Sequence, residues 1–168
     1  MNKCIFLDRD GVINLERGDY TYHKEDFKIL PGVVDSLKKL KEQGYLLIVV
    51  TNQAGISRGI YSRDQMYECH SILQQSCGHI IDDIYYCPYH PTLTESIARK
   101  PGTLMFERAI AKYNIDTQLS WMVGDRERDL IPAEKLGMKT ILVSGNAKIS
   151  IANYMNTSLE HSVPIILK

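Results

Sequence analysis

The chain has 168 residues, of which 44% are apolar and 24% are charged, and its formal net charge is zero. This length suits one domain, so we expect a single domain over residues 1–168, with a core at about 3–145 and a C-terminal extension at 146–168. The balanced charge argues against a nucleic-acid-binding protein, which would be strongly basic.

In the first half of the chain, apolar runs alternate with helical patterns. Residues 4–7 are a short apolar run, and residues 45–50 are a longer one, typical of a strand buried on both faces. Between them, Pro31 opens a segment with apolar residues at helical spacing, and Gly44 stands where glycine often follows a helix. Ser62 begins the next predicted helix, because a glutamine three residues later completes a capping box.

The second half continues this alternation of strands and helices. Residues 84–87 predict a strand, and Pro101 opens a predicted helix that runs through about Tyr113. Residues 121–123 and 140–143 predict two further strands, each short and apolar.

The end of the chain is less regular. A short helix is predicted after Asp129, where Pro132 fits only in the first turn, because the backbone N–H groups there have no helical partner. Residues 144–168 have weaker patterns, with one strand expected at 163–167.

Strands separated by helices favour an α/β fold with a doubly wound, Rossmann-like parallel sheet that helices cover on both faces. In such sheets, ligands bind beyond the carboxyl ends of the strands. Three predicted strands end directly in polar residues, at Asp8, at Thr51 and Asn52, and at Asp125. We therefore expect these residues to meet at one edge of the sheet.

Two acids follow the first predicted strand. A carboxylate such as Asp8 can attack phosphorus and form an aspartyl-phosphate. A second acid, Asp10, can protonate the leaving oxygen and then activate a water molecule. Taken alone, this stretch is equally an ordinary Asp-Gly turn, which is common.

Groups that can bind phosphate occur at two further places. The Thr51 hydroxyl and the Asn52 amide can donate hydrogen bonds to phosphate oxygens, and the glycine-containing loop after them supplies Arg58. Arg99 and Lys100 precede a predicted helix start, which favours an anion, and Lys100 can bridge the nucleophile and the phosphoryl group. Singly, these groups are more often solvated charges or plain loop residues.

The last polar group follows the strand at residues 121–123. Asp125 is a suitable ligand for Mg²⁺, which prefers oxygen ligands and keeps several waters, so that few carboxylates suffice. The alternative is a charged turn in which Asp129 is a helix N-cap. Together, the acids, the hydroxyl and amide, and the lysine supply what phosphoryl transfer requires, so we predict a magnesium-dependent phosphatase.

Residues 6–14, Phe-Leu-Asp-Arg-Asp-Gly-Val-Ile-Asn, resemble the first motif of the haloacid dehalogenase superfamily of phosphatases. The resemblance covers about residues 3–145 and implies a fold without a large cap domain. It implies that Asp8 is the nucleophile and Asp10 the general acid and base, with Mg²⁺ held by the Asp8 carboxylate, the Asp10 backbone carbonyl and Asp125.

The same resemblance assigns the remaining motif residues. Thr51 and Asn52 are expected to bind the phosphoryl group, Lys100 to offset its charge, and Asp129 to support the site. More narrowly, the chain is similar to the branch of D-glycero-D-manno-heptose 1,7-bisphosphate 7-phosphatases and histidinol phosphatases.

The loop at residues 51–59, Thr-Asn-Gln-Ala-Gly-Ile-Ser-Arg-Gly, resembles the heptose branch. That likeness implies removal of the 7-phosphate from a heptose bisphosphate, a precursor of the surface lipopolysaccharide. A bisphosphate needs a second anion site, for which Arg58, Arg99 and Arg17 are candidates, because guanidinium groups bind phosphate in bidentate fashion. Gln53 is expected to contact the substrate.

The chain departs from the family at two places. Both branches commonly have a zinc loop, but here the stretch is Cys87-Pro88-Tyr89-His90 and no further cysteine precedes Arg99. A structural zinc site has four nitrogen or sulfur ligands, so we predict that zinc is absent. Arg126 stands where a lysine commonly follows the metal-binding aspartate, which keeps the charge.

Other functions remain open at this stage. One is hydrolysis of histidinol phosphate or another small phosphomonoester, and another is a non-catalytic phospho-ligand module, because fold does not fix function. A receiver-type signalling domain also uses a phosphorylated aspartate, but it should not place a second acid two residues later.

The cellular setting is inferred from the cysteines and the N-terminus. The four cysteines are an even number, but Met1 leads directly into a short apolar run, unlike a secretory signal. No apolar stretch approaches the length of a membrane span. We therefore expect free thiols, a cytoplasmic monomer, and no membrane or nucleic-acid partner.

Overall fold

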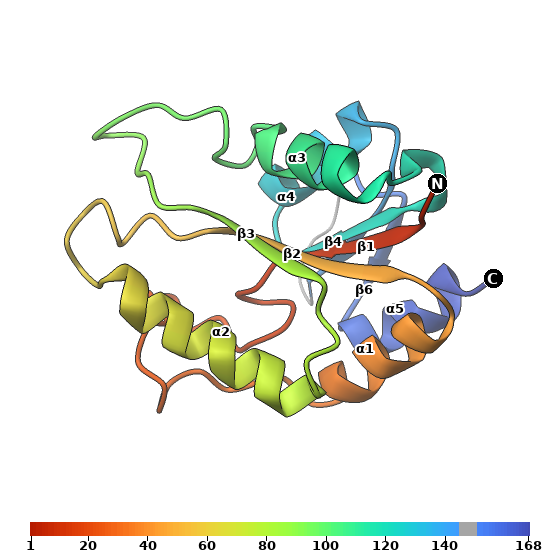
Figure 1. Ribbon diagram of the computed structural model, residues 1–168, viewed down its shortest axis with the longest axis horizontal. Coiled ribbons are helices and arrows are strands. Elements are labelled where there is room, and N and C mark those ends of the chain that lie inside the picture. Colours follow the sequence, from red (N-terminus) through yellow and green to blue (C-terminus); the bar gives the residue numbers. More distant parts are fainter. Residues whose placement is uncertain (145–150) are drawn as a thin grey trace.

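The computed structural model describes residues 1–144 and 151–168, and its framework is one six-stranded sheet in the order β3-β2-β1-β4-β5-β6 (Figure 1). Every neighbouring pair of strands is parallel. The strands are β1 (Cys4–Leu7), β2 (Leu46–Asn52), β3 (Asp83–Cys87), β4 (Trp121–Gly124), β5 (Lys139–Val143) and β6 (Tyr154–Asn156). The α/β class and the doubly wound parallel sheet are therefore confirmed.

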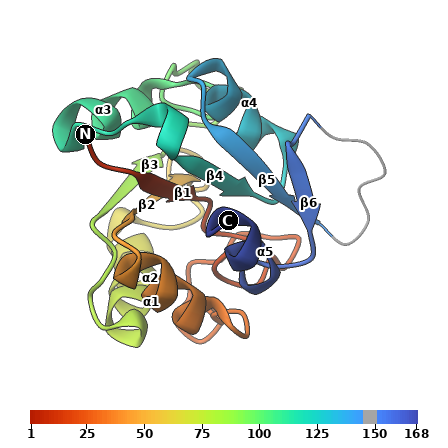
Figure 2. The same ribbon diagram turned by 90° about the vertical axis from the view of Figure 1, so that its right-hand side faces the viewer.

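Helices cover both faces of the sheet (Figure 2). Helices α3 and α4 lie on one face, and α1, α2 and α5 lie on the other. Their bounds are α1 (Val33–Glu42), α2 (Arg63–Cys77), α3 (Leu104–Tyr113), α4 (Glu127–Lys135) and α5 (Leu159–Ile166), with a short 3₁₀ helix at Thr117–Leu119. Within the described residues, no helix combines the length and the apolar character that crossing a membrane requires.

The alternation of side chains along β1 explains why both faces are covered. Ile5 and Leu7 belong to the core on the α1, α2 and α5 side, whereas Cys4 and Phe6 belong to the core on the α3 and α4 side. Successive strand residues point to opposite faces, so an apolar run needs two covering layers. The sequence predicts burial on both faces for the run at 45–50, and β2 confirms it, because Leu47 and Val49 lie in one core and Ile48 and Val50 lie in the other.

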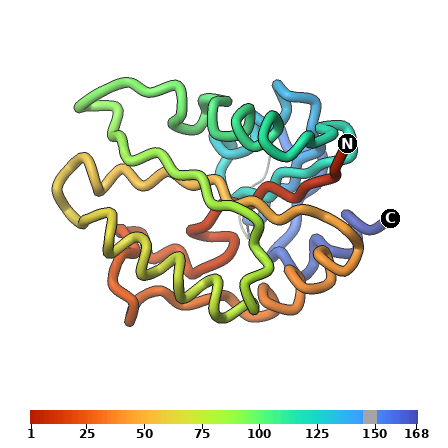
Figure 3. Tube along the Cα trace, viewed as in Figure 1, coloured from red at the N-terminus to blue at the C-terminus, as the bar shows by residue number. Residues whose placement is uncertain are grey.

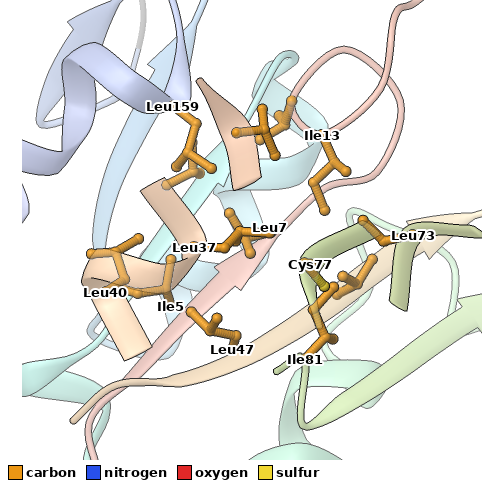
Figure 4. Close-up of a cluster of buried hydrophobic side chains, with 14 of the residues drawn as sticks. Ile5, Leu7, Ile13, Leu37, Leu40, Leu47, Leu73, Cys77, Ile81 and Leu159 are labelled. Atoms are coloured by element: carbon orange, nitrogen blue, oxygen red, sulfur yellow. The ribbon is translucent and has the colours of Figure 1, made fainter. Parts of the chain in front are cut away.

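The larger core joins the helices on one face to the central strand. Leu37 and Leu40 of α1 and Leu159 of α5 lie beside Ile5 and Leu7 of β1 (Figure 4). All five of these side chains are no more than 1% exposed. The segment expected to be a C-terminal extension therefore contributes a strand to the sheet and a helix to this core.

The chain reverses its direction of travel across the sheet after β3. The strands β2 and β3 lie on one side of β1, and β4, β5 and β6 lie on the other. A crevice forms at the carboxyl ends of strands that flank such a switch point. The loops after β2 and β3 project from the edge of the sheet where the strands have their carboxyl ends, whereas both chain termini lie at the opposite edge (Figure 3).

Most predicted helix ends agree with the structure. The Ser62 hydroxyl accepts a hydrogen bond from the Gln65 N–H, and the Gln65 side chain accepts one from the Ser62 N–H, which confirms the capping box. Gly44 has a positive φ of 79° just after α1, as expected for a residue that follows a helix. Helix α1 begins at Val33, two residues after Pro31.

Two predictions about helices and one about a strand were wrong in position or type. The helix predicted from Pro101 begins at Leu104, because the Gly102 N–H donates to the Arg99 carbonyl at 2.6 Å and closes a separate turn first. Pro132 lies inside α4, beyond its first turn, and its ring is buried. The residues 163–167 expected to form a strand lie mostly in α5, whose buried Leu159, Val163 and Ile166 have helical spacing.

Candidate active site

A polar cavity of about 450 Å³ opens at the carboxyl ends of β1, β2 and β4. The nine residues that the sequence predicted as catalytic, metal-binding, phosphate-binding or substrate-binding all line it: Asp8, Asp10, Thr51, Asn52, Gln53, Arg58, Arg99, Lys100 and Asp125. Four separate stretches of the chain thus meet in one place. The structure places these residues together, while the role of each remains a prediction.

Lys100 is a buried residue that lines the cavity. Its Nζ is 2.8 Å from Asp8 Oδ1 and 2.8 Å from Asp129 Oδ1, and it donates to the Val50 carbonyl at 2.8 Å. The side chain is 1% exposed. Burial lowers the pKa of the ammonium, but the charges of Asp129 and Asp8 outweigh this and raise it, so Lys100 stays protonated.

The backbone of Lys100 is held by Asn52. The Asn52 Oδ1 accepts from the Lys100 N–H at 3.0 Å, and the Asn52 Nδ2 donates to the Lys100 carbonyl at 3.1 Å. The Asn52 side chain, which was expected to bind the phosphoryl group, therefore also positions the lysine. This pair of bonds joins the end of β2 to the turn before α3.

Three carboxylates lie close enough together to be candidate ligands of a cation. Oxygen atoms of Asp8, Asp125 and Asp129 lie within 4.8 Å of one another, and within residues 1–144 and 151–168 this is the only such group of potential metal ligands. Burial, and then the Asp129 charge, raises the pKa of Asp8 to about 6. Burial, and then the charges of Asp8 and Asp129, raises the pKa of Asp125 to about 8.

Asp8, Asp125 and Asp129 share few cations: Lys100 contacts Asp8 and Asp129, and Arg126 lies 3.6 Å from Asp125. Gly11 brings its backbone close to Asp125: with φ at 85°, an added Cβ would lie 2.5 Å from Asp125 Oδ2. An all-oxygen donor set with excess negative charge matches the preference of Mg²⁺. The residues present therefore fit the predicted ion, with Asp8 and Asp125 facing the cavity and Asp129 occupied by Lys100.

Asp10 is held by donors on all sides of its carboxylate. Arg9 donates from Nε to Oδ2 at 3.2 Å and from a terminal nitrogen to Oδ1 at 3.0 Å. The Asn14 amide donates to Oδ1 at 2.9 Å, and the Gln53 amide donates to Oδ2 at 3.3 Å. The side chain still keeps 23% of its surface exposed, so it reaches the cavity.

Three of the arginines that line the cavity have no carboxylate partner in the described part of the chain. Arg58 donates to the Tyr20 hydroxyl at 3.2 Å, and Arg99 donates to the Tyr89 carbonyl at 3.2 Å. Arg128 has a buried Nε with no hydrogen-bond partner. Burial, and then the charge of Arg128, lowers the pKa of Arg99.

Arg17, the third candidate for a second anion site, does not line this cavity. It forms an ion pair with Asp26 at 2.6 Å instead. Arg126 does line it, 3.6 Å from Asp125 Oδ2 and 3.2 Å from Glu16. Of these two arginines, only Arg126 lies where it can meet a ligand.

The loop between β3 and Lys100 is held by hydrogen bonds and packing. Ser57 donates its N–H to the Pro88 carbonyl at 3.1 Å and accepts the His90 N–H on its hydroxyl at 2.9 Å. The His90 Nδ1 lies 2.7 Å from the Thr92 hydroxyl, and Cys87 is buried at the end of β3. That zinc is absent from this loop stays a prediction.

Among the residues that line the cavity, sequence reasoning gave no role to Arg9, Tyr61 or Arg128. Arg9 stands between two acids, and nothing in that pattern shows that its side chain is only 1% exposed. Tyr61 lies in an irregular segment, where no periodicity indicates which way its side chain points. Arg128 could have been noted, because it lies between Asp125 and Asp129 at the start of α4.

Comparison with known proteins adds a family to this geometry. A model described as HAD-hydrolase-like matches residues 97–159. A D-glycero-β-D-manno-heptose-1,7-bisphosphate 7-phosphatase of Haemophilus ducreyi is 42% identical over 147 residues, covering 82% of this chain and 80% of that protein. The protein of the same name from Haemophilus influenzae is 38% identical, covering 100% of this chain and 98% of its own.

Solved structures show the same fold. The D,D-heptose 1,7-bisphosphate phosphatase of B. bronchiseptica, solved with magnesium and phosphate, has a TM-score of 0.87 at 24% identity and covers 98% of both chains. The D,D-heptose 1,7-bisphosphate phosphatase of Burkholderia thailandensis has a TM-score of 0.70 at 23% identity and covers 99% of both. These likenesses confirm the expected architecture without a large cap domain.

Proposed function

The chain belongs to the family of D-glycero-β-D-manno-heptose-1,7-bisphosphate 7-phosphatases, and we propose that it hydrolyses the 7-phosphate of this heptose bisphosphate in a magnesium-dependent reaction. The observation that supports this most directly is the meeting of Asp8, Lys100 and Asp125 in one cavity. The carboxylate, the ammonium and the acid come from three distant stretches, as phosphoryl transfer requires.

Asp8 is the proposed nucleophile. One of its carboxylate oxygens bonds to the phosphorus of the 7-phosphate while the bond to the sugar oxygen breaks, which leaves an aspartyl-phosphate. Lys100, at 2.8 Å from Asp8 Oδ1, remains next to the carboxylate throughout. Its buried positive charge stabilises the charge that spreads over the phosphoryl oxygens in the transition state.

Asp10 is the proposed general acid and base. It gives a proton to the departing sugar oxygen, and it then takes a proton from the water that attacks phosphorus and regenerates Asp8. Its exposed edge faces the same cavity as Asp8. The Thr51 hydroxyl lines the cavity beside these two acids and can donate to a phosphoryl oxygen.

The proposed Mg²⁺ ligands are the carboxylates of Asp8 and Asp125 and the backbone carbonyl of Asp10. When bound, the ion supplies positive charge that reduces the repulsion between the nucleophile and the phosphate dianion. Asp129 supports the site indirectly, because its carboxylate holds Lys100 at 2.8 Å.

The unpaired arginines support a substrate with a second anionic group. Arg58, Arg99 and Arg128 line the same cavity as the catalytic acids, so their guanidinium groups can bind the phosphate that is not cleaved. Guanidinium groups bind phosphate through paired N–H donors. Gln53, also expected to contact the substrate, is 2% exposed, and its amide donates to Asp10.

We also propose that the protein acts as a cytoplasmic monomer in the synthesis of lipopolysaccharide heptose. Its four cysteines are free and buried, which suits a reducing compartment.

A substrate panel tests the proposed function. The wild-type chain is assayed for phosphate release from both anomers of heptose 1,7-bisphosphate and from histidinol phosphate, with and without Mg²⁺, and ³¹P NMR identifies the phosphate lost. We expect Mg²⁺-dependent loss of the 7-phosphate and much slower turnover of histidinol phosphate. Faster turnover of histidinol phosphate would contradict the substrate assignment.

A further inference from the structure

The side-chain amide of Gln53 connects Tyr61 to two residues of the proposed active site, Thr51 and Asp10. The Tyr61 hydroxyl lies 2.6 Å from Gln53 Oε1. On its other side, Gln53 Nε2 lies 2.9 Å from Thr51 Oγ1 and 3.3 Å from Asp10 Oδ2. Tyr61, Gln53 and Thr51 are all buried, with at most 5% of their surface exposed. The amide therefore has fixed partners at both ends.

The direction of each hydrogen bond follows from the chemistry of the groups. An amide oxygen has no hydrogen, so Tyr61 must be the donor to Gln53 Oε1. Burial raises the pKa of the Tyr61 hydroxyl, so it keeps the proton that it donates. With its oxygen held by Tyr61, the amide can present only its NH₂ group to Thr51 and Asp10.

This orientation determines what Thr51 can offer a ligand. A hydroxyl has one hydrogen and two acceptor positions. Because Thr51 Oγ1 accepts from Gln53, its own hydrogen is left over, and in the described part of the chain that hydrogen is donated to no protein group. Thr51 lines the cavity, so this hydrogen is available to a phosphoryl oxygen.

We propose that Tyr61 is a positioning residue, which acts through the Gln53 amide to hold the Thr51 hydroxyl and the Asp10 carboxylate in the arrangement used for phosphoryl transfer. This inference rests on the proposed phosphatase activity, because Thr51 and Asp10 are its proposed phosphate-binding and acid–base residues. A flipped amide would turn its oxygen toward the Asp10 carboxylate, where two acceptors would face each other, and toward Thr51, whose hydrogen it would then take.

The ring of Tyr61 is held in place by packing contacts that do not involve its hydroxyl. It stacks on Tyr22 with 5.0 Å between ring centroids and lies 5.8 Å from the ring of Tyr20. It also closely covers Gly55, where any added Cβ would collide with the ring. A phenylalanine ring fits the same space, so Tyr61→Phe removes the hydrogen bond to Gln53 and keeps the ring contacts.

Tyr45→Phe is the matched control. Tyr45 is also buried, at 8% exposed, and its hydroxyl donates to the Ile166 carbonyl at 3.3 Å, away from the cavity. Both variants thus lose one buried tyrosine hydroxyl. A general effect of losing such a group would be the same in the two proteins, whereas an effect on catalysis would follow only from Tyr61.

The kinetic test uses heptose 1,7-bisphosphate with Mg²⁺ and reports kcat and KM separately, at a temperature where circular dichroism shows each protein fully folded. We expect kcat of Tyr61→Phe to fall about five- to tenfold, as for the loss of one hydrogen bond, with KM changed by less than about twofold. Tyr45→Phe should keep the wild-type kcat. Wild-type kcat in Tyr61→Phe would overturn the inference.

A double-mutant cycle with Gln53→Ala tests the route of the effect. Because Tyr61 acts through Gln53, adding Tyr61→Phe to Gln53→Ala should lower kcat by less than about twofold. The same loss in both backgrounds would overturn the inference, because Tyr61 would then act by another path.

A measurement without turnover separates this inference from the proposed function. In ¹⁵N-labelled protein, the Gln53 side-chain NH₂ should give two sharp signals that exchange slowly with water, and Tyr61→Phe should broaden them while Tyr45→Phe should not. Unchanged signals in Tyr61→Phe would contradict the fixed amide. A wild-type protein that hydrolyses no phosphate ester would contradict the proposed function instead, whatever the NMR result.

Discussion

Replacing Lys100 tests how much its ion pairs with Asp8 and Asp129 stabilise the fold. Lys100→Met keeps a long unbranched side chain but removes the ammonium that lies 2.8 Å from both Asp8 and Asp129. Two buried carboxylates then lose their counter-charge, which typically destabilises a protein by about 3–5 kcal/mol. A chain of this size loses about 2–4 °C in Tm per kcal/mol, so we expect Tm to fall by about 6–20 °C.

The sign of the pH dependence follows from the carboxylates. In the wild type, Lys100 opposes the burial and the Asp129 charge that raise the pKa of Asp8 to about 6. Without the ammonium, the pKa of Asp8 rises further. A carboxyl group whose pKa is higher in the folded than in the unfolded protein lowers the free energy of unfolding. The loss grows as the pH rises above the pKa of the unfolded state, near 3.8. The deficit in Tm should therefore be larger at pH 8 than at pH 5.

Lys112→Met is the matched control for this experiment. Lys112 Nζ also lies 2.8 Å from a carboxylate, that of Asp83, but the lysine side chain is 59% exposed. Exposed pairs contribute little, because water screens them. Thermal unfolding followed by circular dichroism should show a small change for Lys112→Met and a large one for Lys100→Met. Equal changes, or a Lys100→Met deficit that does not depend on pH, would refute the reasoning.

Three further perturbations follow from the same structure. Burial, and then the Arg9 charge, lowers the pKa of His70 to about 3, so the wild type should lose stability as pH falls from 6.5, and His70→Leu should flatten the Tm profile between pH 4 and 6.5. Gly11→Ala should lower Mg²⁺-dependent kcat at least tenfold, about 1.4 kcal/mol, because its Cβ displaces Asp125. Arg128→Gln should raise KM about tenfold for heptose bisphosphate but should not change KM for a monophosphate. The control Arg108→Gln, at an exposed residue, should change neither KM. If Arg128→Gln raised KM equally for both substrates, the result would contradict a second anion site.

The arrangement of the site was accessible from the sequence, because it follows from where strands end. Asp8, Thr51 and Asp125 each follow an apolar run, and in a parallel sheet the ends of neighbouring strands meet. Apolar spacing and the Ser62 cap likewise gave the main elements, since both depend on local chemistry.

What the sequence could not predict depends on contacts between distant segments. The β-branched residues at the C-terminal end suggest a strand, but packing of Leu159 and Val163 against α1 makes them helical. Arg9 donates to the Thr21 carbonyl and the Tyr61 ring stacks on Tyr22, so both side chains are placed by a loop that no local pattern brings next to them. Tertiary contacts decide these cases, and local propensity does not.

The central claim is that Asp8 becomes phosphorylated during turnover, and chemical trapping tests it directly. The protein is mixed with heptose 1,7-bisphosphate and Mg²⁺, quenched in acid within milliseconds and reduced with borohydride, which converts an aspartyl-phosphate to homoserine. Mass spectrometry of the N-terminal peptide should then show homoserine at position 8 in the wild type and no modification in an inactive Asp8→Asn variant. An active Asp8→Asn protein, or homoserine at another aspartate, would contradict the account.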